Sequence, residues 1–117
     1  MNTSTFAAAS DLPLACVPDA IPAAERRAHF ALLERLFTAE LRERRTLDDG
    51  YAYRFDTAAF DDLARWIVHE RRCCPFLRFT LDIAPADGPL WVSLTGPEGT
   101  HAFLDAELSH SPQPASQ

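Results

Sequence analysis

Apolar side chains recur at helical spacing in the first third of the folded part of the chain. The stripe consists of Phe30, Leu33, Leu36, Phe37 and Leu41. This spacing predicts a helix over residues 22–45. The proline at position 22 suits a first helical turn, because its missing N–H has no intrahelical partner there.

A strict alternation follows a turn signal. The cluster Asp48-Asp49-Gly50 predicts a turn. Tyr51, Tyr53 and Phe55 then alternate with small or charged residues, and this pattern is typical of a half-buried strand.

A second helix is predicted between residues 56 and 74. Asp56 is a suitable N-cap, and the helix must end before Pro75, because the residue before a proline is disfavoured in helical geometry. Its apolar positions are Phe60, Leu63, Ala64, Ile67 and Cys74.

The remaining segments predict a hairpin and a last helix. Alternation over residues 77–83, a loop at 85–89 and an apolar run at 90–94 indicate two paired strands. The segment Thr95-Gly96-Pro97-Glu98 has capping-box spacing and predicts a helix from near Pro97. The buried stripe expected for that helix is Ala102, Phe103, Ala106 and Leu108.

These elements predict a single α+β domain at residues 15–108. Their order is α-β-α-β-β-α, with a three-stranded, largely antiparallel sheet covered by helices. Residues 1–14 are predicted to form a flexible arm and residues 109–117 a disordered tail, because neither segment offers much to bury.

Composition excludes several classes of function. The 117 residues carry a formal net charge of −6, and all 11 basic residues are arginine. We therefore expect no general nucleic-acid binding, no lysine Schiff base and no P-loop. No apolar run is long enough to cross a membrane, and the N-terminus lacks the basic start of a secretory signal. We expect a cytoplasmic protein with free thiols, and a homo-oligomer stays open.

Candidate chemistry gathers in residues 69–76, which read HERRCCPF. Glu70 precedes Cys73 by three residues and Cys74 by four, so a helix brings its carboxylate within reach of both thiols. His69 precedes Cys73 by four residues, a spacing at which imidazole and thiolate can share a metal. Cys16 lies just before the first predicted helix, where folding could bring a third thiol to the pair.

This arrangement favours binding of a soft metal or metalloid over redox cycling within the vicinal pair. Adjacent cysteines have Cα atoms about 3.8 Å apart, which is below the usual disulfide range of roughly 4.4–6.8 Å. Three thiolates from Cys16, Cys73 and Cys74 suit Hg(II), Cu(I) or As(III). With His69 or Glu70 as a fourth ligand, they would suit zinc.

Two other interpretations stay open at this point. In a thiol enzyme or sensor, Glu70 would be the catalytic base for Cys73 or Cys74, and Cys16 would resolve the oxidised form. In a plain interaction module the cysteines would only pack, because free cysteines are often buried. We expect His29, His101 and His110 at the surface and His69 more readily on a solvent-facing helix side than on a metal.

The segment Glu70–Phe79 resembles a family of small bacterial proteins that carry the motif E-R-x-C-C-x-F-L-x-F. Members of that family also have an upstream Ala-Cys before an arginine-bearing helix, which Ala15-Cys16 and either Arg26 or Arg27 match. Some similar proteins are associated with heavy-metal (mercury) resistance. The resemblance implies a soft-metal site at the three cysteines, with Glu70 beside it as a proton-handling residue.

Overall fold

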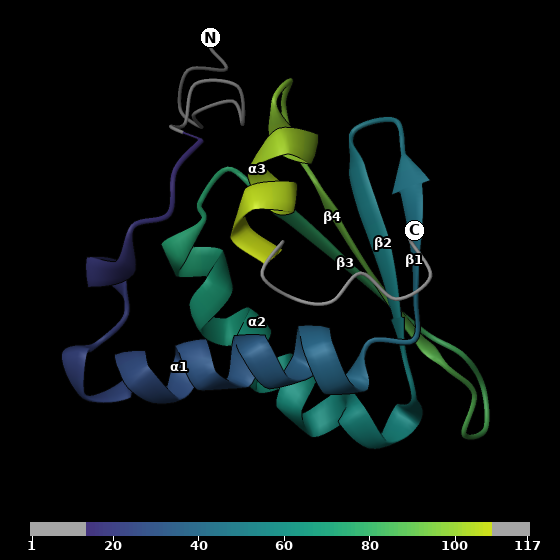
Figure 1. The fold of residues 1–117 in the computed structure, drawn as a ribbon. Helices are drawn as coiled ribbons and strands as arrows, with labels where there is room; N and C mark the ends of the chain where they lie inside the picture. The colour runs from purple at the N-terminus through teal and green to yellow at the C-terminus, as the bar shows by residue number, and fades with distance from the viewer. Residues whose placement is uncertain (1–13, 109–117) are drawn as a thin grey trace, which may run out of the picture.

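Three helices gather on one side of a four-stranded antiparallel sheet in the computed structural model (Figure 1). The structure describes residues 14–108. The predicted tail and all but the last residue of the predicted arm lie outside the described residues. The strand order across the sheet is β1-β2-β4-β3. A single α+β domain therefore agrees with the sequence analysis.

The elements follow one another as α-β-β-α-β-β-α, joined by short helical turns at residues 18–20, 36–40 and 57–59. The helices and strands are α1 (Ala23–Arg35), β1 (Glu43–Leu47), β2 (Gly50–Phe55), α2 (Phe60–Cys73), β3 (Arg78–Ile83), β4 (Leu90–Thr95) and α3 (Thr100–Leu108).

The prediction of a three-stranded sheet was wrong, because residues 43–47 form an edge strand and not the end of the first helix. The α-helix ends at Arg35, and one π-helical turn carries the chain to Glu40 before it becomes extended at Leu41. Strand β1 pairs with β2 on one side only and is half-exposed. Its charged side chains therefore give no hydrophobic alternation that a sequence pattern could detect.

The predicted caps and stripes also need correction. Asp56 makes no side-chain capping bond; it pairs with Arg42, and α2 begins four residues later, at Phe60. In α3 the buried positions are Thr100, Leu104 and Leu108, whereas Ala102 and Ala106 are exposed.

The core lies between the helices and the inner face of the sheet. Leu90, Val92 and Leu94 alternate with half-buried residues along β4, which identifies the face that the helices cover. Phe37 makes edge-to-face contacts with Trp66 of α2, at a ring-centroid distance of 5.1 Å, and with Phe55 of β2, at 5.5 Å. The ring of Trp66 is fully buried. This aromatic contact fixes α2 against the sheet.

Replacing Gly50 with alanine tests the pairing of β2 with β4. A Cβ at this position would overlap the backbone carbonyl of Leu94. We expect Gly50→Ala to lower the free energy of unfolding by about 1–3 kcal/mol, because backbone must shift to accommodate the methyl group. Urea denaturation measures this change. The control Asp49→Ala, at an exposed position of the same turn, should change it by less than about 0.5 kcal/mol; equal effects would contradict the prediction.

Candidate thiol site

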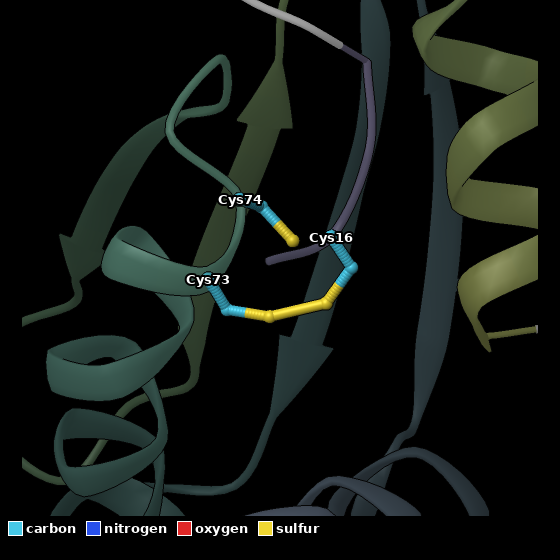
Figure 2. A group of neighbouring side chains, drawn as sticks. All are labelled: Cys16, Cys73 and Cys74. Atoms are coloured by element: carbon cyan, nitrogen blue, oxygen red, sulfur yellow. A yellow bond between two sulfur atoms is a disulfide. The ribbon is translucent and has the colours of Figure 1, made fainter. Parts of the chain in front are cut away.

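A disulfide joins Cys16 to Cys73 across 57 residues of sequence, with their Cα atoms 5.2 Å apart (Figure 2). Cys16 lies in the segment that leads into α1, and Cys73 is the last residue of α2. The expectation that all three cysteines are free thiols was therefore wrong for these two. The adjacent cysteines do not bond to each other, as expected from the short distance between neighbouring Cα atoms, and Cys74 is free.

The end of α2 separates the two adjacent cysteines structurally. Cys74 leaves the helix with φ −121° and ψ 76°, as expected before Pro75. Its backbone N–H still donates to the Glu70 carbonyl at 2.8 Å. The backbone N–H of Val17 donates to the Cys73 carbonyl at 2.7 Å, and this bond holds the upstream segment against the helix end.

The three sulfur atoms lie within 4.8 Å of one another. Cys73 and Cys74 are fully buried, and Cys16 is half-buried. Figure 2 shows the Cys74 side chain directed toward the other two cysteines. The predicted meeting of Cys16 with the pair is thereby confirmed, and it brings together two segments far apart in sequence.

A buried carboxylate links the free thiol to a histidine. The Cys74 thiol donates to Glu70 Oε2 at 3.3 Å, and His29 Nε2 lies 2.9 Å from Glu70 Oε1. Glu70 is 1% exposed and His29 3% exposed. Both carboxylate oxygens thus have partners, which offsets much of the cost of burying Glu70.

Glu107 of α3 adds a second carboxylate to this cluster. One oxygen each of Glu70 and Glu107 and the Cys74 sulfur all lie within 4.8 Å of one another. Burial, followed by the nearby Glu70, raises the pKa of Glu107 to about 7, although His29 acts in the opposite direction. The cluster therefore combines two acids and one imidazole at the inner side of the thiols.

Burial raises the pKa of the Cys74 thiol well above its usual range, and the acidic groups Glu70 and Glu107 raise it further. Near neutral pH this thiol is protonated and a poor nucleophile, since the thiolate is the reactive form. A bound cation would reverse this, because the positive charge of a metal deprotonates its thiol ligands.

The structure places His69 away from the sulfur atoms and beside another acid. Its Nε2 lies 2.7 Å from Glu25 Oε1, and its ring is 5.8 Å from the ring of His29. The role of His69 as a metal ligand, the less favoured of its two expected roles, stays a prediction. A groove of about 540 Å³ between α1 and α2 is lined by both histidines, and none of the three cysteines lines it.

Sequence reasoning missed His29 and Glu107. The expectation that His29 lies at the surface was wrong, because it faces the core. It precedes the buried residues Leu32 and Leu33 by three and four positions, a helical spacing that could have revealed it. Glu107 similarly adjoins the buried stripe of Leu104 and Leu108. His101 is half-buried, and its Nε2 lies 2.8 Å from the Leu47 carbonyl oxygen. His110 lies outside the described residues.

The donor set fits a soft ion. The three sulfur atoms are the soft ligands, and the two carboxylates of Glu70 and Glu107 lie next to only one of them, Cys74. A trigonal site with bonds of about 2.3 Å separates its sulfur atoms by about 4 Å, so the bonded sulfurs of Cys16 and Cys73 must move apart to form one. The bond between Cys16 and Cys73 must be reduced before both can be ligands.

Comparisons with protein-family models, with curated proteins and with solved structures find no match to this chain. The resemblance of residues 70–79 to the bacterial family therefore stays a prediction. Within residues 14–108, no helix is both long and apolar enough to span a membrane.

Reducing the disulfide should destabilise the fold. We expect reduction to lower the free energy of unfolding by about 2–4 kcal/mol, because a covalent loop of this length restricts the unfolded chain. Urea denaturation of the oxidised and reduced protein measures the difference. Cys16→Ser should match the reduced protein and show no further response to reductant, and identical midpoints for the oxidised and reduced wild type would contradict the prediction.

The raised pKa of Glu107 predicts a pH-dependent stability. The folded protein retains a proton on Glu107 up to about pH 7, whereas the unfolded chain loses it near pH 4.5. This stabilisation is therefore complete below pH 4.5 and is lost as the pH rises through about 7. Glu107→Gln should remove the dependence and be more stable than the wild type at pH 8 by about 1–2 kcal/mol, after allowance for solvent screening.

Urea denaturation from pH 5 to pH 8 compares the two proteins, and the difference between their curves isolates Glu107. Glu98→Gln, at an exposed position, is the matched control and should follow the wild type throughout. Parallel curves for Glu107→Gln and the wild type would contradict the assignment.

Proposed function

We propose that this protein binds a soft metal or metalloid ion through Cys16, Cys73 and Cys74 once the disulfide is reduced. The observation that carries the proposal is the meeting of three sulfur atoms within 4.8 Å, from two segments that the fold brings together. Had the cysteines been buried apart, only a packing role would remain.

Electrostatics supports a cationic or electrophilic ligand. Three thiolates, of which Cys74 lies next to Glu70 and Glu107, would create a strongly acidic cluster. Among the described hydrogen bonds, only that of His29 brings a basic side chain to Glu70. A thiophilic ion would supply the missing positive charge and displace the Cys74 proton. The expected ligands are therefore Hg(II), Cu(I) and As(III), which tolerate three sulfur ligands. Zn(II) would need a fourth donor.

A second candidate function rests on the disulfide itself. The disulfide between Cys16 and Cys73 supplies the pair of cysteines that a thiol–disulfide protein cycles between oxidised and reduced forms. The buried, protonated Cys74 thiol counts against its use as an attacking nucleophile with Glu70 as base. The redox candidate therefore uses Cys16 and Cys73, while the ion-binding candidate uses all three cysteines.

Native mass spectrometry of the reduced protein distinguishes the candidates. The protein is reduced with a phosphine, which leaves no competing thiol, and is titrated with arsenite, Hg(II), Cu(I) and Zn(II). With arsenite, three thiols condense with As(OH)₃ to give one As–S₃ centre and three waters. We expect a mass gain of one arsenic atom minus three hydrogens, which two-thiol binding cannot produce.

Matched variants test the ligand set. Cys16→Ser, Cys73→Ser and Cys74→Ser should each weaken ion binding roughly 100-fold. The binding free energy of a four-ligand metal site is about 10–16 kcal/mol, so each ligand contributes about 3 kcal/mol. The double variant Cys16→Ser/Val68→Cys keeps three thiols but moves one to an exposed position of α2, and it should bind as weakly as Cys16→Ser alone. Unchanged uptake in these variants would refute the proposal, and reversible redox cycling without ion uptake would favour the second candidate.

A further inference from the structure

The disulfide exposes its two halves unequally. Cys16 is half-buried and lies between exposed neighbours, of which Val17 is 40% exposed. Cys73 is fully buried at the end of α2, as is Cys74 behind it. Among the three cysteines, only Cys16 therefore has solvent exposure. Its side chain comes from the segment upstream of α1 (Figure 2).

The difference in exposure decides which sulfur an external thiol can reach. A thiolate must approach the sulfur that it attacks. Cys73 is fully buried, whereas Cys16 is half-buried within an exposed segment. The groove between α1 and α2 gives no other route, because none of the three cysteines lines it.

We infer that an external dithiol forms a mixed disulfide with Cys16 and so opens the ion site. The opening of an ion site rests on the proposed function, whereas the position of the mixed disulfide does not. One thiolate of the dithiol attacks the Cys16 sulfur and forms a new S–S bond. The Cys16–Cys73 bond breaks, and Cys73 leaves as a thiolate that takes a proton from water. The second thiol of the dithiol then loses its proton and attacks the dithiol sulfur that is bonded to Cys16. This step closes a disulfide within the dithiol and releases Cys16 as a thiolate, which takes up a proton.

The exchange balances and is reversible. The dithiol loses two electrons and two protons and becomes a disulfide, while Cys16 and Cys73 gain them and become thiols. In the closed form the two sulfurs are bonded to each other, so a three-sulfur site cannot form. The redox state of the Cys16–Cys73 pair thus decides whether the ion has a site.

Opening the bond leaves the ligands close together. Besides the disulfide, the Val17 N–H donates to the Cys73 carbonyl, and the fully buried Ile21 anchors the segment. Arg26 Nε also lies 3.2 Å from the Pro18 carbonyl and 3.3 Å from the Ile21 carbonyl. Reduction therefore frees the thiols without releasing the segment that carries Cys16.

Trapping the mixed disulfide tests the site of attack. The oxidised full-length protein is treated briefly with glutathione, a monothiol that cannot resolve its own adduct, and is then quenched with acid and capped with N-ethylmaleimide. Cleavage after arginine separates Cys16, in residues 1–26, from Cys73, in residues 73–78. We expect the glutathione adduct on Cys16 at least tenfold more often than on Cys73.

The same reaction in guanidinium is the matched control, because unfolding exposes both sulfurs and should make the two adducts about equally frequent. Cys74→Ser repeats the native experiment without a third thiol that could reshuffle the bond. An adduct mainly on Cys73, equal native adducts, or a native disulfide that resists the monothiol would overturn the inference.

Ion uptake separates this inference from the proposed function. Oxidised protein should take up no arsenite, and protein reduced by a dithiol and then freed of it should take up one equivalent. If the reduced protein binds no ion while Cys16 carries the glutathione adduct, the proposed function fails, and so does the control of ion binding by the disulfide. Cys16 then still stands as the site of thiol–disulfide exchange. If the adduct forms on Cys73 while the reduced protein binds arsenite, the proposed function stands and the inference fails.

Discussion

The contact between the segment around Cys16 and the last turn of α2 is the constraint on which the site depends. It consists of the disulfide and of a backbone hydrogen bond from Val17 to Cys73. Pro75 ends the helix at this point, so Cys74 leaves the helical path while Cys73 remains in it. As a result, two adjacent cysteines point to different partners: Cys73 bonds to Cys16, and Cys74 faces Glu70.

The buried polar cluster behind the thiols explains why this region differs from an ordinary core. Glu70 and His29 occupy positions that hydrophobic residues could fill, and the contact between His29 Nε2 and Glu70 Oε1 offsets part of the cost of their burial, although His29 Nδ1 has no hydrogen-bond partner among the described residues. With Cys74 and Glu107 nearby, the cluster couples α1, α2 and α3 at one place. A change of charge at the thiols, whether by ion binding or by deprotonation, therefore acts on groups from all three helices.

The strands and helices were predictable to the degree that each buries a regular face. The alternation of Tyr51, Tyr53 and Phe55 identified β2, which has a strand on either side and one face on the core. The edge strand β1 escaped detection because it has a neighbour on one side only and carries charges along much of its length. The apolar helical spacing ends at Leu41, and no local signal after it indicates that the chain changes from helix to strand. The predicted helix was therefore extended into β1.

The sequence by itself determined the composition of the site: a carboxylate one helical turn before two thiols, a proline that stops the helix, and a third thiol upstream. These features are local and follow from the spacing of residues along a helix. Only the tertiary structure decided that Cys16 bonds to Cys73, and that His29 and Glu107 complete the cluster. Such pairings depend on where α1 and α3 pack against α2, and packing between distant segments leaves no periodic signal in the chain.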